Sequence, residues 1–393
     1  MLGGKVNRDK EPMKNVLFEN CQNRPFGLFP EKRFSPQGPK PLMAMLEVTQ
    51  RCNMTCPVCF AGSGNNGADL SMDDIDKALR NLMNVTETPI PLQISGGEPT
   101  MRDDLPKIVH MAQILGFKNI ELITNGIRIV QEPEYLTRLK ENGLTAVYLQ
   151  FDGLRPETTL AIRGRDMSRI RRKAVKIIRK TDLCCTLAVV VTRSVNDNEI
   201  GDIVQFAIDN IDTVRAINFQ AATRLTGRFD MDAHYQGYSL EELLKLIEDQ
   251  TGVGADTFIS EPLGHPDCNS MSQVYLVKDR LEPLFKYISK KDVRRFLGEN
   301  SHEIVLAGFT GKTDFFFKYL LNPSAWRLIA KAAPIFGTNP YNVLKSKHLL
   351  LFAKSFMEKQ AMEPERVNNC CYAITTPAGV YSFCAYNNYH RFA

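Results

Sequence analysis

Three of the ten cysteines in this 393-residue chain lie within eight consecutive positions. Cys52, Cys56 and Cys59 fall in the stretch RCNMTCPVCF, with the spacing Cys-x3-Cys-x2-Cys. A zinc site at this place would need a fourth ligand from elsewhere in the chain. A loop of this spacing can instead wrap around a cubane iron–sulfur cluster, bind three of its irons and leave the fourth without a protein ligand. The spacing therefore indicates a metal centre with one open position.

A second set of cysteines lies far from this loop. Its members are Cys268, Cys370, Cys371 and Cys384. Four thiolates suffice for another iron–sulfur cluster, although the neighbours Cys370 and Cys371 can ligate together only at a turn or bulge, because successive strand residues point to opposite faces. The alternative is that one or two of these thiols are buried in the core. Cys21 is a spare candidate ligand, whereas Cys184 and Cys185 begin an apolar run and are expected in the core.

Short apolar runs alternate with amphipathic segments from about residue 43 onward. Six runs are expected to be strands: 44–49, 91–95, 119–124, 146–151, 186–191 and 216–220. Helical periodicity lies between them, as in 71–83 and 103–116. Strand and helix in alternation predict an α/β protein with a parallel sheet, and six units favour a partial (β/α)6 barrel of the TIM type over an open doubly wound sheet. Ligands of such a barrel bind at the carboxyl ends of its strands, where the cysteine loop begins.

The pattern divides the chain into five segments. These are an N-terminal extension (1–40), the barrel (41–225), a bridging segment with Cys268 (226–280), a helical apolar and basic segment (281–362) and a C-terminal cysteine-containing segment built on a turn-rich strand pair (363–393). Residues 281–362 mix Lys and Arg with Phe, Leu and Tyr at helical spacing. Helices of this kind can lie on an anionic membrane, form the wall of a long apolar tunnel, or simply pack on the barrel.

Composition narrows the class of protein. Lys and Arg number 49 against 44 Asp and Glu, so the net charge of +5 is too small and too dispersed to argue for nucleic acid. The first residues lack the apolar stretch of a signal peptide, and no run of eighteen apolar residues occurs, so we expect a cytoplasmic protein. In that reducing compartment, clustered cysteines are more often metal ligands or redox-active thiols than disulfides.

The cysteine loop resembles the signature of the radical S-adenosylmethionine (SAM) enzymes, in which the amino and carboxylate groups of SAM bind the fourth iron. Four further stretches carry the resemblance in order along the barrel: SGGEPT (95–100), ITNG (123–126), LQFDG (149–153) and IRGRD (162–166). One departure is Val58, since the residue before the third cysteine is often aromatic in the family; here Phe60 follows instead.

The resemblance implies roles for individual residues in binding the cofactor. Gly96 and Gly97 would let the backbone approach the ligand, Glu98 would accept from the SAM ammonium, and Arg163 resembles the arginine that pairs with the SAM carboxylate. Further cofactor-binding candidates are Pro99, Asn125, Gln150, Asp152 and Asn218. Polar residues at strand ends can equally be turn formers.

The resemblance also implies the reaction class. An electron from a donor such as ferredoxin or flavodoxin enters the [4Fe-4S] cluster, the SAM sulfonium bond breaks, and the 5′-deoxyadenosyl radical removes hydrogen from an inert carbon. The protein positions that radical and excludes water and stray hydrogen donors.

The C-terminal stretch CCYAITTPAGVYSFCAYNNYHR, together with the barrel motifs, is similar to the radical SAM subfamily of tetraether lipid synthase and the dihydropterin methyltransferases. This similarity implies an auxiliary [4Fe-4S] cluster near the substrate. The favoured hypothesis is hydrogen removal from a lipid (isoprenoid) chain with carbon–carbon bond formation and peripheral membrane contact. The chain departs from the synthase at its start, because residues 1–40 offer only Cys21 where that enzyme has a cysteine-rich metal module.

Three alternatives stay open. Methylation of a pterin or similar small molecule would be marked by a compact polar pocket in place of an apolar channel. Modification of a ribosomally made peptide would call for a peptide-clamp domain. Outside the enzymes, the chain could be an iron–sulfur or zinc interaction protein without turnover.

Overall fold

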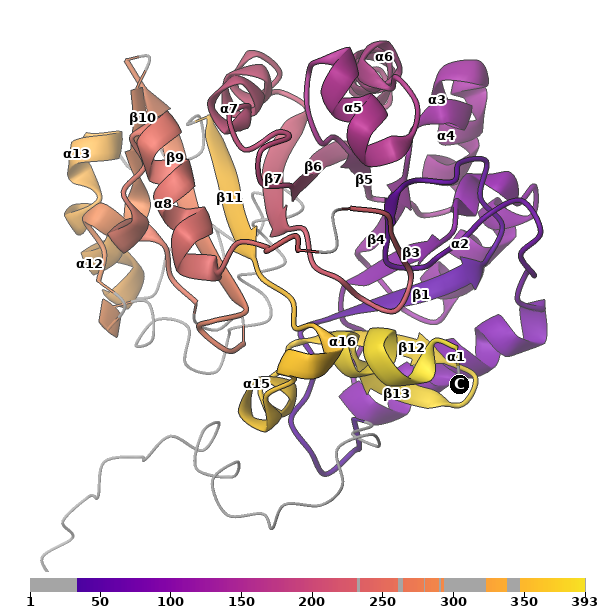
Figure 1. Cartoon of the computed structure of the whole chain (residues 1–393). Coiled ribbons are helices and arrows are strands. Elements are labelled where there is room, and N and C mark those ends of the chain that lie inside the picture. The colour runs from indigo at the N-terminus through magenta and orange to yellow at the C-terminus, as the bar shows by residue number, and fades with distance from the viewer. Residues whose placement is uncertain are drawn as a thin grey trace, which may run out of the picture.

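A single curved sheet of eleven strands forms the centre of the molecule (Figure 1). The computed structural model describes residues 34–231, 234–260, 264–278, 280–289, 291–292, 323–337 and 347–392. Six parallel strands make the middle of the sheet in chain order: β1 (Met43–Thr49), β3 (Leu92–Gly96), β4 (Ile120–Thr124), β5 (Ala146–Gln150), β6 (Cys184–Val191) and β7 (Val214–Ala221). All six expected strands are confirmed, and with them the α/β fold with a six-stranded partial barrel.

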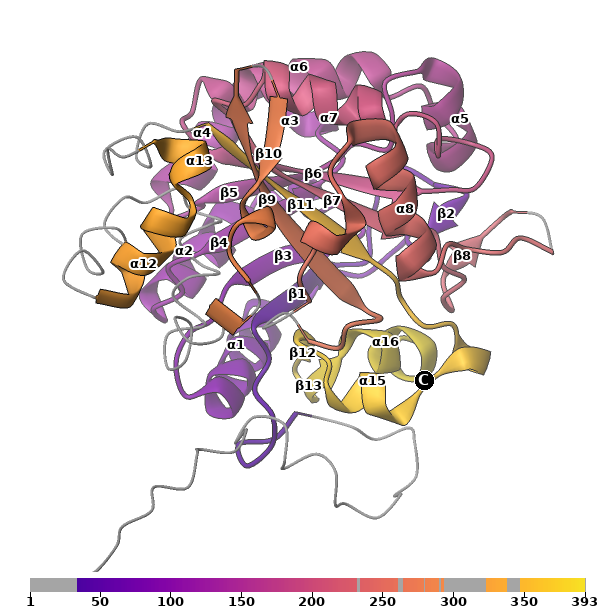
Figure 2. The same cartoon turned by 90° about the vertical axis from the view of Figure 1, so that its left-hand side faces the viewer.

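Helices connect the strands and cover the outer face of the sheet (Figure 2). They are α1 (Met72–Thr86), α2 (Leu105–Ile114), α3 (Ile127–Gln131), α4 (Pro133–Glu141), α5 (Pro156–Arg163), α6 (Ser168–Arg179), α7 (Ile200–Asp209) and α8 (Leu240–Thr251). The Ser71 hydroxyl caps α1 by accepting from the backbone N–H of Asp74 at 3.1 Å, as its position three residues earlier predicts. Ser239 and Glu242 form a reciprocal capping box on α8.

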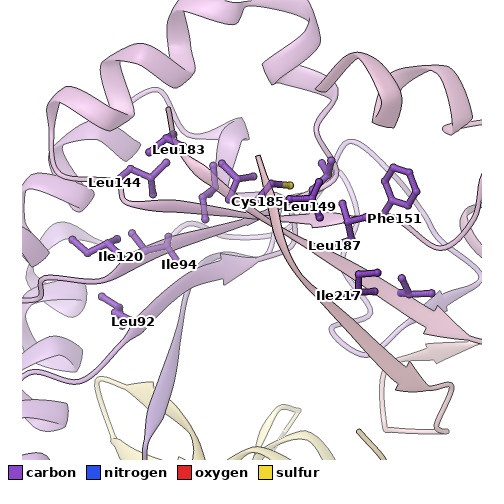
Figure 3. Packing of buried hydrophobic residues seen from close by; sticks show 14 of the residues in the cluster. Leu92, Ile94, Ile120, Leu144, Leu149, Phe151, Leu183, Cys185, Leu187 and Ile217 are labelled. Carbon is purple, nitrogen blue, oxygen red and sulfur yellow. The ribbon is translucent and has the colours of Figure 1, made fainter. Parts of the chain in front are cut away.

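Alternation along the strands separates an apolar outer face from a polar inner one. Leu92, Ile94, Ile120, Leu149 and Leu187 pack with the helices in the main core, and Cys185 lies among them as expected (Figure 3). The residues of opposite parity are largely polar and include Glu47, Gln93, Glu121, Tyr148, Thr186 and Asn218, all buried. Hydrogen bonds join Gln93 and Thr186 to Glu121, so these side chains share the interior of the barrel.

Both sides of the six-stranded unit are extended. On the β1 side follow β12 (Tyr372–Thr376), parallel to β1, and β13 (Gly379–Ser382), antiparallel to β12, so the predicted C-terminal strand pair is confirmed. On the β7 side follow β11 (His348–Lys354), parallel to β7, then antiparallel β9 (Asn269–Val277) and β10 (Arg280–Pro283).

The sheet curls until its two sides meet. Lys354 on β11 and Tyr372 on β12 are separated by six strands in the sheet order, yet the Lys354 ammonium lies 5.1 Å from the centre of the Tyr372 ring. Near the C-terminus, Arg391 forms a two-point ion pair with Glu47 of β1, with N–O distances of 2.9 and 2.5 Å. Residues from the end of the chain therefore cover one end of the barrel interior.

The remaining elements are short. They are β2 (Val58–Cys59), β8 (Arg228–Phe229), α12 (Pro323–Lys331), α13 (Ala333–Phe336), α15 (Pro364–Asn368), α16 (Phe383–Ala385), the π-helix η7 (Tyr386–His390) and the 3₁₀ turns η3 (Pro99–Met101), η4 (Ala255–Thr257), η5 (Leu284–Lys286) and η6 (Lys359–Ala361). Among the described residues, no helix combines the length and the apolar character needed to cross a membrane.

The prediction of helix across residues 281–362 was wrong at β11. The run HLLLFAK is a strand with both faces covered: Leu349 and Leu351 join the main core, while Leu350 and Phe352 pack with Ala216 on the inner face. A short run that is apolar at every position has no periodicity to distinguish strand from helix. Helices α12 and α13 agree with the prediction. Most of the remaining segment, like Cys21 and the rest of residues 1–33, lies outside the described residues.

Candidate functional site

The loop with Cys52, Cys56 and Cys59 leaves the carboxyl end of β1 and is held from the other side of the barrel. Its short strand β2 pairs with β8, and Arg228 of β8 donates to the carbonyl oxygens of Cys56 at 3.0 Å and Ser63 at 3.2 Å. A side chain at Gly227 would place its Cβ 2.3 Å from the Cys59 carbonyl oxygen. Glycine is therefore required there for the two segments to pack.

The three thiols share one largely apolar site. Cys52 and Cys56 are buried and Cys59 is partly buried, and they pack with Met54, Ile127 and Met167. Burial, together with the nearby charges of Glu98, Cys56 and Cys59, raises the pKa of Cys52 to about 12. Burial also raises the pKa of Cys56, but the positive charge of Arg163 opposes it. Buried thiolates therefore need metal or positive charge to be stable here.

An iron–sulfur cluster fits this donor set. Soft thiolates in an apolar shell are the ligands of such clusters, and three of them leave one iron for a non-protein ligand. In the part of the chain that the structure describes, no three His, Cys, Asp or Glu side chains surround a single metal-ion position. A cubane does not require such convergence, because each of its irons takes a different cysteine.

A buried ion triad stands beside the cysteines. The fully buried Asp152 carboxylate accepts from Arg163 Nε and Nη2 at 2.7 and 2.6 Å and from Arg171 Nη2 at 2.6 Å. The backbone N–H of Val190 adds a bond of 3.1 Å. Burial alone would raise the pKa of Asp152, but the two arginines outweigh it and lower the pKa to about 2. Two cations sharing one anion leave a net positive charge near Cys56, which favours an anionic thiolate-bound cluster.

Arg163 and Arg171 differ in how many of their N–H donors have a hydrogen-bond acceptor. Besides its bonds to Asp152, Arg163 donates through Nη1 to the Val58 carbonyl at 3.0 Å. Arg171 is fully buried, yet its Nε and Nη1 have no hydrogen-bond partner among the described residues. Within the described part of the chain, its one further hydrogen bond is a long one, 3.5 Å, from Nη2 to Gln150 Oε1. Buried guanidinium donors without an acceptor point to a bound anion.

The glycines of the SGGEPT stretch serve the packing of the chain on itself. A Cβ at Gly96 would lie 2.2 Å from the Thr49 carbonyl oxygen, and one at Gly97 would lie 2.2 Å from that of Arg51. Gly96 also has a φ of 139°, which other residues rarely adopt. These glycines thus let the end of β3 contact the start of the cysteine loop. Pro99 follows as the first residue of η3.

Glu98 connects the ends of β3 and β4. Its carboxylate accepts from Thr100 N and Oγ1, from Thr124 Oγ1 at 2.7 Å and from Asn125 N at 2.8 Å. Oε1 takes three of these bonds and Oε2 takes one, so Oε2 keeps an acceptor position for the predicted bond to the SAM ammonium. Asn125 also donates through Nδ2 to Asn53 Oδ1 at 2.8 Å, which ties β4 to the cysteine loop.

The structure brings the second set of cysteines together from three distant segments. Cys268 precedes β9, Cys370 and Cys371 precede β12, and Cys384 lies in α16. Burial and, to a smaller extent, the other thiols of the set raise the pKa of Cys268 to about 11 and that of Cys371 to about 12. The pKa of Cys384 is raised by burial and by Cys370 and Cys268. Arg366 donates to Cys268 Sγ at 3.2 Å and supplies positive charge.

Aromatic contacts link the two sets of cysteines. Phe60 follows Cys59, and its ring centre lies 5.7 Å from that of Phe383, which precedes Cys384. Tyr372, next to Cys371, stacks on Phe383 at 5.1 Å. Ring contacts therefore connect the segments that carry the two sets of cysteines.

Sequence reasoning missed Arg171, Arg228 and Gly227. Arg171 did leave a signal: it occupies the buried stripe of α6 together with Ala174, Val175 and Ile178. An arginine within the buried apolar stripe of a helix almost always has a charged partner, so its position suggests a structural or functional role. Asn218, a predicted cofactor-binding residue, is buried on the inner face of β7 beside Tyr148.

The chain is similar to known proteins over this same region. Residues 46–207 match the model of the Radical SAM superfamily. The chain is a radical SAM enzyme, whose class uses a [4Fe-4S] cluster and SAM.

Individual relatives differ in how much of the chain they share. The 7,8-dihydro-6-hydroxymethylpterin dimethyltransferase of Methanocaldococcus jannaschii is 29% identical over an alignment that covers 99% of this chain and 83% of its own length. The GTP 3′,8-cyclase of Geobacter sulfurreducens is 30% identical, over 51% of this chain and 64% of its own. The crystal structure of Streptococcus suis SuiB bound to S-adenosylmethionine has a TM-score of 0.43 at 21% identity and covers 53% of this chain and 47% of that one.

We expect Cys56→Ala to abolish SAM cleavage, because losing one of three thiolates unmakes the cluster. The measurement is release of 5′-deoxyadenosine by anaerobically reconstituted protein with dithionite and SAM. Cys184→Ala is the matched control, since this β6 thiol belongs to neither set. Cleavage surviving in Cys56→Ala would refute the assignment.

We expect Cys371→Ala and Cys384→Ala each to lower the iron content to about half, as loss of one of two cubane clusters requires. Product formation should fall while uncoupled SAM cleavage continues. Iron and sulfide assays per chain check this, again with Cys184→Ala as control. Unchanged iron in both variants would exclude the auxiliary cluster.

Proposed function

We propose that this radical SAM enzyme methylates a reduced pterin or a similar small polar heterocycle. The polar interior of the barrel carries the proposal: Glu121 accepts hydrogen bonds from Gln93 and Thr186 there, and Tyr148 and Asn218 lie beside them. A hydrocarbon chain against these groups would leave polar atoms unpaired at about 1–3 kcal/mol each. A heterocycle rich in N–H and C=O groups would pair with them.

The comparison with the pterin dimethyltransferase supports the same substrate class. Its alignment runs through nearly the whole of this chain, including the C-terminal cysteine segment, whereas the cyclase alignment covers about half.

The residues around the first cysteine loop fit the SAM cofactor. When bound, the cluster and SAM together supply reductive formation of a 5′-deoxyadenosyl radical for hydrogen abstraction. Cys52, Cys56 and Cys59 would hold the cluster. We further infer that Arg171, with its unpaired buried donors, binds the SAM carboxylate, and that Arg163 positions Arg171 by sharing Asp152. This modifies the expectation from sequence, which gave that role to Arg163.

We expect Arg171→Lys to weaken SAM binding by about 10- to 100-fold, the loss of about 1.5–3 kcal/mol for a bond to a charged group. Equilibrium dialysis with reconstituted protein measures the affinity, and iron content checks that the cluster remains. Arg172→Lys is the matched control, because Arg172 is next to Arg171 on α6 but is exposed to solvent. Wild-type affinity in Arg171→Lys would return the role to Arg163.

A lipid substrate with carbon–carbon bond formation is the second candidate. Met45, Ile123 and Phe356 form part of an apolar cluster beside Cys384, and a hydrocarbon chain would suit that part of the interior. Membrane contact and a ferredoxin or flavodoxin electron donor stay predictions.

Turnover with candidate substrates separates the two. Reconstituted enzyme with SAM and dithionite is incubated with 6-hydroxymethyl-7,8-dihydropterin or with an isoprenoid ether lipid, and products are identified by mass spectrometry. We expect 5′-deoxyadenosine release to depend on the pterin, which gains the mass of one or more CH₂ groups. Dependence on the lipid alone would overturn the proposal, and absence of any SAM cleavage would favour a non-catalytic cluster protein.

A further inference from the structure

The interior of the barrel contains polar groups that the SAM site does not use. Six of them form what we call the interior polar cluster: Gln93, Glu121, Tyr148, Thr186, Asn218 and Lys354. They come from β3, β4, β5, β6, β7 and β11, so the curl of the sheet alone places them together. Three of the six, Glu121, Lys354 and Asn218, have hydrogen-bonding capacity that the described residues leave unused.

Glu121 retains one acceptor site on each oxygen. Its Oε2 accepts from Gln93 Nε2 at 2.6 Å, and its Oε1 accepts from Thr186 Oγ1 at 3.0 Å. A carboxylate oxygen can accept two hydrogen bonds. The orientation of Gln93 is set by Tyr372, whose hydroxyl donates to Gln93 Oε1, so the amide must turn its N–H toward Glu121. A ligand with two parallel N–H donors would fill the open acceptor site on each oxygen of the Glu121 carboxylate.

Lys354 brings a positive charge to the same interior. Its ammonium lies over the Tyr372 ring and within electrostatic reach of Glu121, and it makes no hydrogen bond within the described part of the chain. Burial lowers its pKa, while Cys371 and Glu121 act in the opposite direction. An ammonium in such a place needs an acceptor oxygen or nitrogen.

Asn218 supplies the third open position. Its side chain is 5% exposed and lies beside Tyr148, and its Oδ1 has no hydrogen-bond partner among the described residues. Buried amide oxygens are nearly always paired in folded proteins. This unpaired oxygen is an observation independent of Glu121 and Lys354, and it also indicates a ligand with N–H groups.

We propose that Glu121, Lys354 and Asn218 recognise a 2-amino-4-oxo heterocycle by its hydrogen-bonding edge. Glu121 accepts from the ring N–H and the exocyclic amino group, which lie side by side on such a ring. Lys354 donates to the adjacent carbonyl, and Asn218 Oδ1 accepts from a further N–H. The inference builds on the proposed function and specifies the groups that select its substrate.

The arrangement sets a specificity. A site that pairs with an amino group rejects an analogue in which that group is a carbonyl, because two acceptors then face each other without a proton. The enzyme should therefore prefer a 2-amino-4-oxopteridine to the 2,4-dioxopteridine of the same shape. An ordinary structural role for Glu121 would give no such preference.

Equilibrium binding of these two pteridines to reconstituted holoenzyme tests the proposal by fluorescence titration. For wild type we expect the 2-amino compound to bind about 100-fold more tightly than the dioxo compound. In Glu121→Gln, whose amide presents a donor in place of one acceptor, we expect the preference to fall to within a few-fold, because about 1.5–3 kcal/mol per charged hydrogen bond is lost. Iron content per chain reports whether the variant retains its clusters.

Two further variants keep the test decisive. Thr186→Val removes a partner of Glu121 and leaves its carboxylate, so the preference should persist. Lys354→Met retains the stem of the side chain and should weaken binding of both pteridines about equally, which gives an answer even if Glu121→Gln does not fold.

The outcomes separate this inference from the proposed function. Wild-type preference in Glu121→Gln, with pterin turnover intact, overturns the recognition site and leaves the function standing. Selective binding without methylation supports the recognition site and overturns the proposed reaction. Failure of wild type to bind either pteridine overturns both.

Discussion

One buried carboxylate, shared by two arginines, holds the catalytic end of this protein together. Asp152 joins the end of β5 to α5 through Arg163 and to α6 through Arg171, and Arg163 reaches the backbone of the cysteine loop at Val58. Isolating any of these charges in the interior would cost several kcal/mol, so the three are mutually dependent. The net positive charge that remains lies beside Cys56, where an anionic cluster is expected, and Arg171 retains donors for an anion. The same interaction thus orders the loop and prepares its electrostatics.

A second constraint is the closure of the curved sheet by the end of the chain. Arg391 pairs with Glu47, Lys354 lies on Tyr372, and Phe60 contacts Phe383, so the C-terminal segment touches both the cysteine loop and the barrel strands. This closure gathers the second set of thiols and encloses the polar interior between them and the first set. The proposed substrate would therefore lie between two cysteine sites, against side chains supplied by nearly every strand.

Much of the barrel could be predicted from local pattern. Its six strands are apolar runs bounded by helical periodicity, and the cysteine loop follows the first of them directly. β11 escaped prediction because burial on both faces removes the alternation that identifies a strand. Glu98 and Arg163 were expected to bind the cofactor, and the structure adds their partners within the protein, Thr124 and Asp152. These partners lie 26 and 11 residues away in the chain and cannot be chosen from sequence alone.

The amino-acid sequence by itself determined the class of chemistry, because the spacing of Cys52, Cys56 and Cys59 is a local property of one loop that three thiolates share. It also determined the strand and helix order, since alternation and periodicity are local too. Only the tertiary structure decided that Arg171 has unpaired donors, that Cys268, Cys371 and Cys384 come together, and that the barrel interior is polar. These features depend on which strand faces meet when the sheet curls, and that is settled by burial and pairing over the whole chain.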